Sequence, residues 1–297
     1  MNTKLLSKYS SIEIKNVYKS SDGSLKYVLS TLDGRIVEAI CFHFTGLFNR
    51  KYLDSQTVCL SSQVGCPIGC KFCASGRIKN PRNLSLRELI DQFYTIEKDL
   101  TFRGVRPIRS VAIMGMGEPL LNLDNVVNFY LELANDKKID TFTLSTVGII
   151  SGIKKLRELK TKIKLYLSVH SPFEKERSSI IPINERYPIT KVVRECRLLA
   201  HKTSRTVVAN YVLIHGFNDS IEHAKALAQL LNPNDFDITL NLLNKIPKLP
   251  FKSSSFEKMD IFKKVLESYG YSVDIQLSKG KDIAGGCGQL AGVCRTK

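Results

Sequence analysis

The chain alternates between strand-like and helix-like segments over most of its 297 residues. The strand-like segments are short and rich in β-branched and aromatic residues, and they cover residues 57–62, 110–116, 141–146, 164–169, 206–214, 237–243 and 272–278. Each of the first six is followed by a segment with helical periodicity. Repeated βα units favour a parallel sheet, because each helix returns the chain to the same edge. Six units, against the eight of a complete barrel, predict an α/β fold with a partial (β/α)6 barrel that is open on one side.

The segments before the barrel predict a separate small sheet. IEIKNVYKS, LKYVLST and IVEAICFHF are divided by SDGS and LDGR, and Asp-Gly turns favour hairpins. We therefore expect a small N-terminal antiparallel β extension at residues 1–45, and a partial barrel with a C-terminal strand and a Gly-rich loop at 46–297. The helices are predicted at 85–100, where Ser85 and Glu88 form a capping box, and at 123–136, 151–160, 189–203, 220–231 and 256–270.

The charge balance bears on the partner. Lys and Arg number 44 and Asp and Glu 28, which gives a formal net charge of +16. A basic excess of this size favours a polyanionic partner, most often nucleic acid, and the alternative is a lysine-rich surface without a partner. No apolar run approaches the roughly 20 residues that span a bilayer. The start, MNTKLLSKYSSIEIK, has no apolar signal core, so we expect a cytoplasmic protein without membrane contact.

Four cysteines lie within CLSSQVGCPIGCKFC (59–73), the first inside the first predicted barrel strand and the other three directly after it. In a reducing cytosol such a group indicates metal or redox chemistry and not a disulfide framework. Cys66, Cys70 and Cys73 form a C-x3-C-x2-C triplet, which can hold a 4Fe–4S cluster and leave one iron without a protein ligand. The alternative is structural zinc with Cys59 as the fourth ligand, although zinc sites usually come as two close pairs of ligands.

Polar and Gly-rich motifs follow several of the predicted strands. Because the loops after the carboxyl ends of the strands build the active site of such barrels, these motifs should meet on one rim. Each of them could separately be a turn or a hydrogen-bonded residue at the barrel mouth, but together they predict a ligand site. They are the cysteine triplet, GMGEP at 115–119, STVG at 145–148, SVH at 168–170 and Asn244.

The triplet in this position resembles the radical S-adenosylmethionine (SAM) superfamily, in which the open iron of the cluster binds SAM. A narrower resemblance, to the RNA adenine methyltransferases RlmN and Cfr, rests on CLSSQVGC, GMGEPLLNLDNV, STVGI, LSVHSP, PINERYPI, GFNDSIEHA and CGQLAG, in this order. In GMGEP, two glycines would let the backbone approach SAM and Glu118 would bind its ammonium group. The resemblance implies SAM contacts from Gly117, Glu118, Ser145, Ser168, Val169, His170 and Asn244.

The family methylates adenine at carbon 2 or carbon 8, and GMGEPLLNLDNV favours carbon 2. Its chemistry implies that SAM methylates Cys287 and that a second SAM supplies the radical that removes a hydrogen atom from the thiomethyl group. The carbon radical then adds to adenine, a base removes the proton from the attacked carbon, and Cys59 attacks the sulfur of Cys287 to form a disulfide. Glu38, in IVEAI, aligns with the family's glutamate and is the candidate base; the alternative is a solvent-facing strand carboxylate. Cys294 is predicted to be a tail thiol outside this chemistry.

The implied partner is RNA, either 23S rRNA or tRNA or both, whose target adenine must leave its stack to reach the barrel. We also expect an electron donor such as a flavodoxin, a monomer, and a short member of the family without its helical N-terminal extension. The alternatives are a radical SAM enzyme with a different substrate and a non-catalytic, metal-containing RNA-binding protein. Basic residues predicted near the rim for phosphate contacts are Lys71, Arg77, Lys79, Arg82, Arg177, Arg186 and the lysines of KIPKLPFK (245–252).

Overall fold

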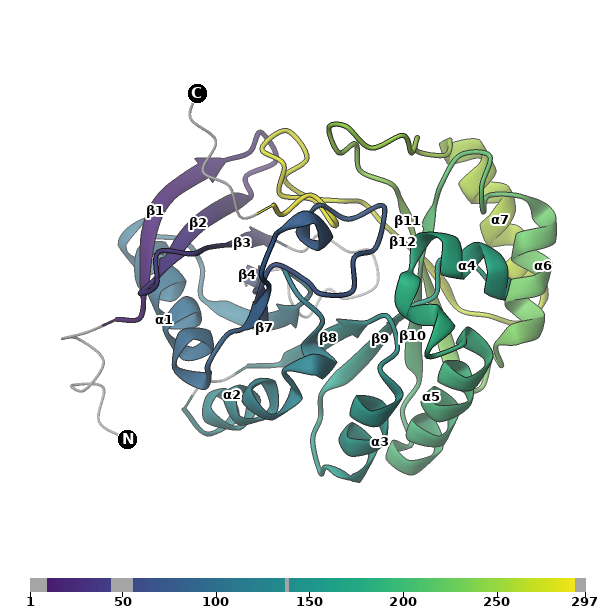
Figure 1. The fold of residues 1–297 in the computed structure, drawn as a ribbon, viewed down its shortest axis with the longest axis horizontal. Coiled ribbons are helices and arrows are strands. Elements are labelled where there is room, and N and C mark those ends of the chain that lie inside the picture. Colours follow the sequence, from purple (N-terminus) through teal and green to yellow (C-terminus); the bar gives the residue numbers. More distant parts are fainter. Residues whose placement is uncertain (1–9, 44–55, 137–138, 292–297) are drawn as a thin grey trace.

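The computed structural model describes residues 10–43, 56–136 and 139–291. In these residues seven strands pair side by side in chain order, all parallel, as the sequence predicts. The sheet ends at the last of them, so the barrel is partial (Figure 1). The strands are β4 (Gln56–Cys59), β7 (Ile108–Ile113), β8 (Thr141–Thr146), β9 (Lys164–Ser168), β10 (Val207–Leu213), β11 (Phe236–Leu242) and β12 (Val273–Gln276).

The helices that connect these strands lie on the outer side of the sheet (Figure 1). They are α1 (Leu86–Phe102), α2 (Leu123–Asp136), α3 (Ile150–Glu158), α5 (Ile189–Thr203), α6 (Ile221–Leu230) and α7 (Phe256–Ser268). The capping box at the start of α1 is confirmed, because Ser85 Oγ accepts from Glu88 N–H and the Glu88 carboxylate accepts from Ser85 N–H. A short helix that the periodicity did not reveal, α4 (Glu174–Ile180), precedes α5.

The predicted N-terminal sheet is present and continues the barrel sheet. Its strands β1 (Ile12–Lys19), β2 (Leu25–Thr31) and β3 (Ile36–His43) pair antiparallel. β3 then pairs antiparallel with β4, with Ile40 opposite Cys59. Because Glu38 lies two residues before Ile40 on β3, this register brings the candidate base close to one of the two candidate cysteines.

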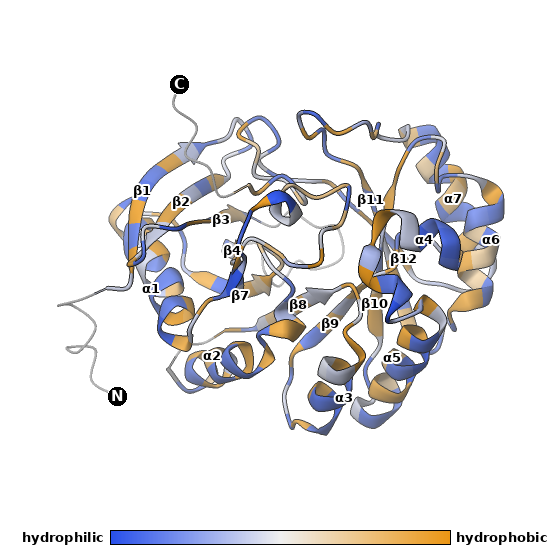
Figure 2. Ribbon diagram, viewed as in Figure 1, coloured by the Kyte–Doolittle hydropathy of each residue, from blue (hydrophilic) through white to orange (hydrophobic). Residues whose placement is uncertain are grey.

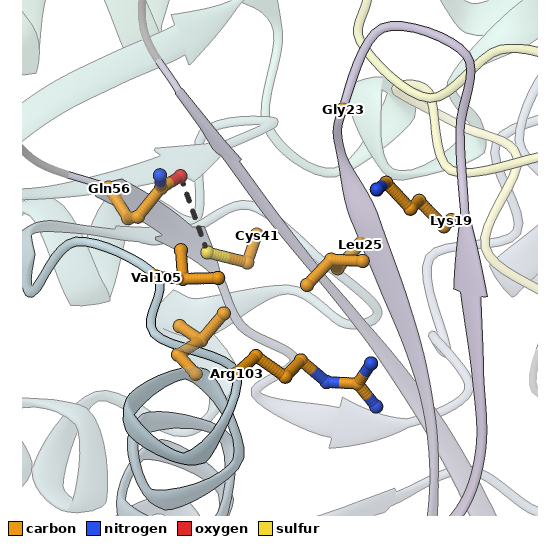
Figure 3. A pocket seen from close by; sticks show the side chains of 8 residues that line it. Lys19, Gly23, Leu25, Cys41, Gln56, Arg103 and Val105 are labelled. Atoms are coloured by element: carbon orange, nitrogen blue, oxygen red, sulfur yellow. Dashed lines mark hydrogen bonds between the residues drawn. The ribbon is translucent and has the colours of Figure 1, made fainter.

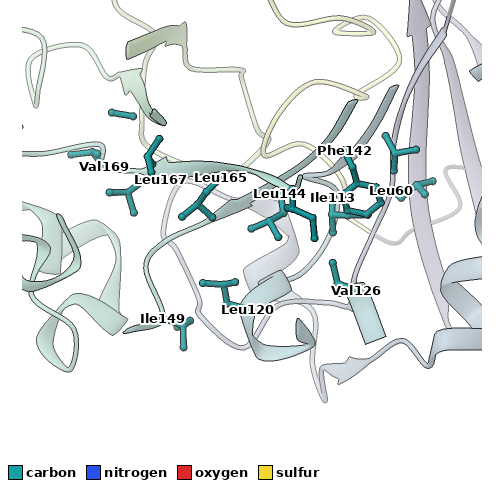
Figure 4. Close-up of a cluster of buried hydrophobic side chains, with 14 of the residues drawn as sticks. Leu60, Ile113, Leu120, Val126, Phe142, Leu144, Ile149, Leu165, Leu167 and Val169 are labelled. Atoms are coloured by element: carbon teal, nitrogen blue, oxygen red, sulfur yellow. The ribbon is translucent and has the colours of Figure 1, made fainter. Parts of the chain in front are cut away.

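Alternation along the strands separates the packed core from the barrel interior. On β8, Phe142 and Leu144 are buried, whereas Thr143 and Ser145 keep some contact with solvent. Phe142 packs edge-on against Phe129 of α2, in the buried cluster drawn in Figure 4. Figure 2 shows hydrophilic and hydrophobic residues interspersed along the outer helices, as expected of helices half-buried on a sheet.

Two strands end three residues earlier than the sequence predicts. β4 ends at Cys59 and not at residue 62, and β7 ends at Ile113 and not at residue 116. Beyond these points the two segments bond to each other outside the parallel ladder: Ser61 Oγ accepts from Met116 N–H, and Ser62 N–H donates to Met116 O. The shortened strands leave the following residues to form the rim.

No helix among the described ranges is both long and apolar enough to cross a membrane.

Gly148, in the loop between β8 and α3, is closely packed against α5 beneath the rim. Its φ is +105°, and a Cβ there would lie 2.4 Å from Val192 Cγ1 on α5. Gly270, after α7, has φ +85° but no heavy atom within 4 Å of such a Cβ. Both Ala variants carry backbone strain, but only Gly148→Ala also overpacks the interior. Gly148→Ala should therefore lose about 1–3 kcal/mol more unfolding free energy than Gly270→Ala in urea titrations. Equal losses would show that α5 moves aside freely.

Candidate active site

Three free cysteines converge in the loop that follows β4. Cys66, Cys70 and Cys73 lie in the triplet loop, residues 65–81, which β5 (Gln63–Val64) and β6 (Arg82–Asn83) close as a small hairpin. Burial raises the pKa of Cys66 to about 12 and also raises the pKa values of Cys70 and Cys73, and the charges of the three sulfurs would repel one another. Three buried sulfurs that interact electrostatically need a cationic centre to be stable as thiolates, so this donor set fits a 4Fe–4S cluster.

A single zinc ion fits these residues less well. Within the described ranges no three His, Cys, Asp or Glu side chains are grouped to hold one metal ion. The zinc alternative also needs Cys59 as a ligand, but the thiol that acts electrostatically on Cys59 is Cys287 and not a member of the triplet. An iron–sulfur cluster binds each thiolate through a different iron, so it accommodates sulfurs that are farther apart.

The triplet loop is anchored at both of its sides. Lys71 N–H donates to Ile180 O at the end of α4, at 2.9 Å. On the other side Ala74 N–H donates to Gly288 O at 2.8 Å, and Ser75 Oγ donates to Leu290 O at 2.7 Å. The loop therefore joins the predicted SAM site to the segment that carries Cys287.

The glycines of GMGEP have a packing role that the sequence did not reveal. A Cβ on Gly115 would lie 2.7 Å from Leu60 O, and a Cβ on Gly117 would lie 2.6 Å from Ser62 Oγ. Gly117 also has φ +108°, which favours glycine. Contact with residues 60–63 therefore requires glycine at both positions, and the approach of this backbone to SAM stays a prediction.

Glu118 is buried beside the triplet. Its Oε1 accepts from Leu120 N–H at 3.0 Å, and its Oε2 accepts from Val147 N–H at 2.9 Å. Burial raises the pKa of this carboxyl to about 7, although these bonds oppose the shift. The carboxylate also interacts electrostatically with Cys66 and Cys70, so GMGEP places an acidic group next to the triplet.

The ends of β8 and β9 bring four of the predicted SAM contacts together. Ser145 Oγ and Ser168 Oγ are 3.2 Å apart, and both side chains keep some exposure. Val169 is fully buried, and its N–H donates to Asn210 O. His170 has φ +58°, and its Nδ1 accepts from Val212 N–H at 3.1 Å.

The imidazole of His170 is neutral. Burial, and the nearby charge of Arg177, lower its pKa to about 3. Because Nδ1 accepts a backbone hydrogen bond, the ring proton is on Nε2. The ring meets Phe72 of the triplet loop edge-on, with centroids 5.1 Å apart. His170 therefore links β9 to the triplet loop by packing.

Two of the basic residues predicted to hold phosphate are used inside the protein. Arg177 is fully buried and donates to Val147 O, Ser168 O, Val169 O and Asn184 Oδ1. Arg82 forms ion pairs with Asp33 and Glu88, both at 2.8 Å. The prediction of phosphate contacts is wrong for Arg177 and is weakened for Arg82, because their charges are already engaged. The other predicted cations, Lys71, Arg77, Lys79, Arg186, Lys245, Lys248 and Lys252, are exposed.

Asn244 lies against the Cys287 loop, which comprises residues 277–291. Its Nδ2 donates to Cys287 O at 3.0 Å and to Ser278 Oγ at 2.8 Å. A Cβ on Gly286 would lie 2.7 Å from the same Nδ2. Asn244 therefore holds the backbone of the Cys287 loop, and its predicted contact with SAM stays a prediction.

Cys59 and Cys287 are near each other, as the resemblance implies. Both thiols are free. Burial, and the neighbouring Cys287, raise the pKa of Cys59 to about 12. Cys287 keeps contact with solvent, but desolvation by the surrounding loops raises the pKa of its thiol as well. Each sulfur must therefore lose a proton before it can act as a nucleophile. Cys294 lies outside the described residues.

Glu38 is not the solvent-facing carboxylate of the alternative interpretation, because its side chain is completely buried. Its Oε1 lies 2.9 Å from Nζ of Lys26, which is 3% exposed, and its Oε2 accepts from Ala291 N–H at 2.8 Å. Lys26 Nζ also donates to Ala284 O at 3.3 Å. The Lys26–Glu38 pair therefore contacts the Cys287 loop on both sides of Cys287.

Sequence reasoning missed Lys26. The signal was present but weak: β2 and β3 form a hairpin in which Val28 pairs with Glu38, so Lys26 is on the same face as Glu38 and one pair away. A lysine near the start of a strand more often points to solvent, and burial of this one depends on the Cys287 loop.

Two cavities border the N-terminal sheet and the rim. One, of about 670 Å³, lies between the triplet loop and the Cys287 loop, and its charged lining residues are Arg77, Lys245, Lys281 and Asp282. The other, of about 480 Å³, lies between the N-terminal sheet and the end of α1 (Figure 3). None of the predicted site residues lines the second cavity. The first cavity adjoins the site, because its lining includes Ala74 of the triplet loop and Ala284 and Ala291 of the Cys287 loop.

Comparisons with known proteins agree with this geometry. The radical SAM superfamily model matches residues 60–228. The protein named "probable dual-specificity RNA methyltransferase RlmN" in Dictyoglomus thermophilum is 41% identical over 291 residues, which are 96% of this chain and 81% of that one. The protein of the same name in Thermus thermophilus is 38% identical over 95% of this chain and 78% of its own. The crystal structure of a radical SAM methyltransferase from Sphaerobacter thermophilus aligns with a TM-score of 0.89 and 32% identity, over 98% of this chain and 84% of that chain.

Removal of the Lys26 ammonium tests the buried pair. Lys26→Met leaves the Glu38 carboxylate buried without its cation, which should lower the unfolding free energy by about 3–5 kcal/mol. The double variant Lys26→Met/Glu38→Gln removes both charges and should recover most of that loss. Urea unfolding of the apoprotein measures both effects. A single variant as stable as the wild type would show that Glu38 does not depend on Lys26.

Proposed function

Because the chain belongs to the radical SAM superfamily and, within it, to the RlmN-type RNA methyltransferases, we propose that it methylates carbon 2 of an adenine base in RNA through an S-methylated Cys287. Its cofactors are a 4Fe–4S cluster and SAM, which when bound supply the reducing electron, the methyl group and the radical. The observation that supports the proposal is twofold: the Cys59 and Cys287 thiols interact electrostatically, and Glu38 bonds to Ala291 in the Cys287 loop. These residues come from three distant parts of the sequence.

In this proposal Cys66, Cys70 and Cys73 hold the cluster, and the neighbouring strand ends hold SAM. Glu118 interacts with two of the triplet sulfurs, so its carboxylate is suitably placed for the ammonium group of SAM. Ser145 and Ser168 offer paired, partly exposed hydroxyls. The remaining proposed contacts come from the segments that follow β7, β9 and β11, and they are Gly117, Val169, His170 and Asn244.

Two sulfurs and one carboxylate then divide the chemistry. Carbon 2 of adenine is an electron-poor amidine carbon, so it cannot attack a methyl donor as a nucleophile. Cys287 instead receives the methyl group and, after loss of one hydrogen atom, bonds to adenine through the methylene carbon. Glu38 removes the proton from the attacked carbon. The radical adduct gives up one electron, which the cluster would accept. Cys59 then attacks the sulfur of Cys287: the S–S bond forms, the bond between that sulfur and the methylene carbon breaks, and the carbon takes up a proton to become the methyl group of the released base.

The environment of Glu38 supports its role as the base. Lys26 holds it beside the Cys287 loop, with the ammonium nitrogen 2.9 Å from Oε1. Its Oε1 is within ion-pair distance of Lys26 but has no hydrogen bond of good geometry among the described residues. That oxygen therefore retains a lone pair for a proton.

The charged surface supports RNA as the substrate. The cavity beside the Cys287 loop has three cations and one carboxylate in its lining, and the exposed lysines of residues 245–252 adjoin it. Such a surface holds a phosphate backbone, and the target base then swings out of its stack towards Cys287. The relatives are named probable dual-specificity RNA methyltransferases, which supports RNA as the substrate, and the RNAs proposed are 23S rRNA and tRNA. An electron donor of the flavodoxin class completes the proposed partners.

The product test is mass spectrometry of nucleosides. 23S rRNA and tRNA would be incubated anaerobically with reconstituted protein, methyl-labelled SAM and a reductant. Labelled 2-methyladenosine is expected, whereas 8-methyladenosine would move the reaction to the other carbon. Label on Cys287 with no labelled nucleoside would mean that the cysteine chemistry is correct and the RNA substrate is wrong.

Variants of the three residues should stop the reaction at different stages. Cys287→Ala should form no labelled nucleoside and no protein–RNA adduct. Cys59→Ala and Glu38→Gln should instead accumulate a covalent adduct, because the steps that release adenine fail after the bond to Cys287 has formed. Denaturing gels with labelled RNA distinguish these outcomes. Cys196→Ala, a buried change on α5, is the matched control and should turn over without adduct. Full turnover by Cys287→Ala would overturn the mechanism.

A further inference from the structure

We propose that Arg177 is a positioning residue for the iron–sulfur site: it places a positive charge without a directly bonded acid beside Cys70 and thereby raises the reduction potential of the bound cluster. This inference rests on the assignment of the cluster to Cys66, Cys70 and Cys73, but not on the RNA substrate or on the roles of Cys59, Cys287 and Glu38.

Arg177 is the largest fully buried side chain in the described part of the chain, with 0% of its surface exposed. All four of its hydrogen bonds end on uncharged oxygens: three backbone carbonyls and the amide of Asn184. It belongs to none of the ion pairs found among the described residues. A buried cation normally has a carboxylate partner, because the desolvation of an unpaired charge is costly. The arrangement therefore calls for a negative group nearby.

The triplet is that neighbouring group. Cys70 and Arg177 lie close enough to interact electrostatically, so the guanidinium would stabilise negative charge on the Cys70 sulfur. The backbone contacts agree with this, because α4, which carries Arg177, receives the Lys71 N–H bond at Ile180 O. Although burial lowers the pKa of Arg177 to about 10, the guanidinium remains protonated at neutral pH.

The acidic residue that offsets Arg177 is Glu174, one turn earlier on α4. The two are linked through Asn184, which accepts from Arg177 and donates to Glu174 Oε2 at 2.9 Å. Glu174 is only partly buried, and its carboxylate also accepts from Ile189 N–H and Thr190 N–H. It therefore compensates the guanidinium indirectly and leaves a positive field towards Cys70.

Reduction adds an electron to the cluster and makes it more negative. A fixed positive charge in a low-dielectric interior stabilises that reduced state, so Arg177 should make the cluster easier to reduce. Glu174 acts in the opposite direction. If Arg177 only stabilised the fold, by bonding to the ends of β8 and β9, its replacement would not shift the reduction potential in the direction that the sign of the removed charge predicts.

The test is an anaerobic redox titration of the reconstituted protein, without RNA, followed by electron paramagnetic resonance. Arg177→Gln should shift the midpoint potential to more negative values, Arg177→Lys should stay near the wild type, and Glu174→Gln should shift it to less negative values. Arg194→Gln removes an exposed charge on α5, which solvent screens, and is the matched control without a shift. Iron content and thermal unfolding are measured for each variant.

Opposite shifts for the Gln variants at positions 177 and 174, with iron content kept, support the inference. An unchanged reduction potential in Arg177→Gln, together with a lower melting temperature, would show that Arg177 only stabilises the fold. That result would overturn the inference. If Arg177→Gln does not retain the cluster, Glu174→Gln decides: a shift to less negative values supports the charge effect, and no shift overturns it. None of these results depends on methyl transfer, so failure here is distinguishable from failure of the proposed function.

Discussion

Parallel pairing of the barrel strands is the constraint on which the site depends. In a parallel sheet every strand ends at the same edge, so residues that are far apart in sequence are brought to one rim without any contact specific to them. The triplet loop follows β4, GMGEP follows β7, and Ser145 and Ser168 end β8 and β9. Hydrogen bonds between the loops then give the rim its detailed shape. Glu118 bonds to Val147, and Lys71 bonds to Ile180.

The antiparallel extension adds a second constraint of a different kind. β3 pairs with β4, and this register puts Glu38 near Cys59 on one sheet. The Cys287 loop, which returns from the far end of the barrel, rests on that sheet through Ala291 and Ala284. The turn between β1 and β2 adds to the support, because Asp22 accepts from Gly280 N–H and Ser21 N–H donates to Asp282. The small sheet is therefore the platform on which the Cys287 loop is held.

Buried charge is concentrated where these parts meet. Lys26 and Glu38 are buried as a pair, whereas Arg177 is buried without a directly bonded acid. A protein retains such groups at a cost in stability, so each of them needs a compensating partner. For Glu38 the partner is Lys26, in the protein itself. For Arg177 the negative group belongs to the iron–sulfur site, which is why the charge of this residue bears on the chemistry and not only on the fold.

The sequence by itself determined the elements, their order and the residue types of the site. Strand alternation, helical periodicity and the C-x3-C-x2-C spacing are local properties, so each can be read within about twenty residues. The sequence alone could not reveal that Lys26 is buried against Glu38 or that Arg177 is unavailable to phosphate. Nor could it reveal that packing on residues 60–63 requires Gly115 and Gly117. Only the tertiary structure decided these points. They depend on strand register and on the Cys287 loop folding back over residues some 250 positions earlier, as in the bond from Ala291 to Glu38. A side chain's exposure is set by what covers it, and in this protein the covering segments come from the opposite end of the chain.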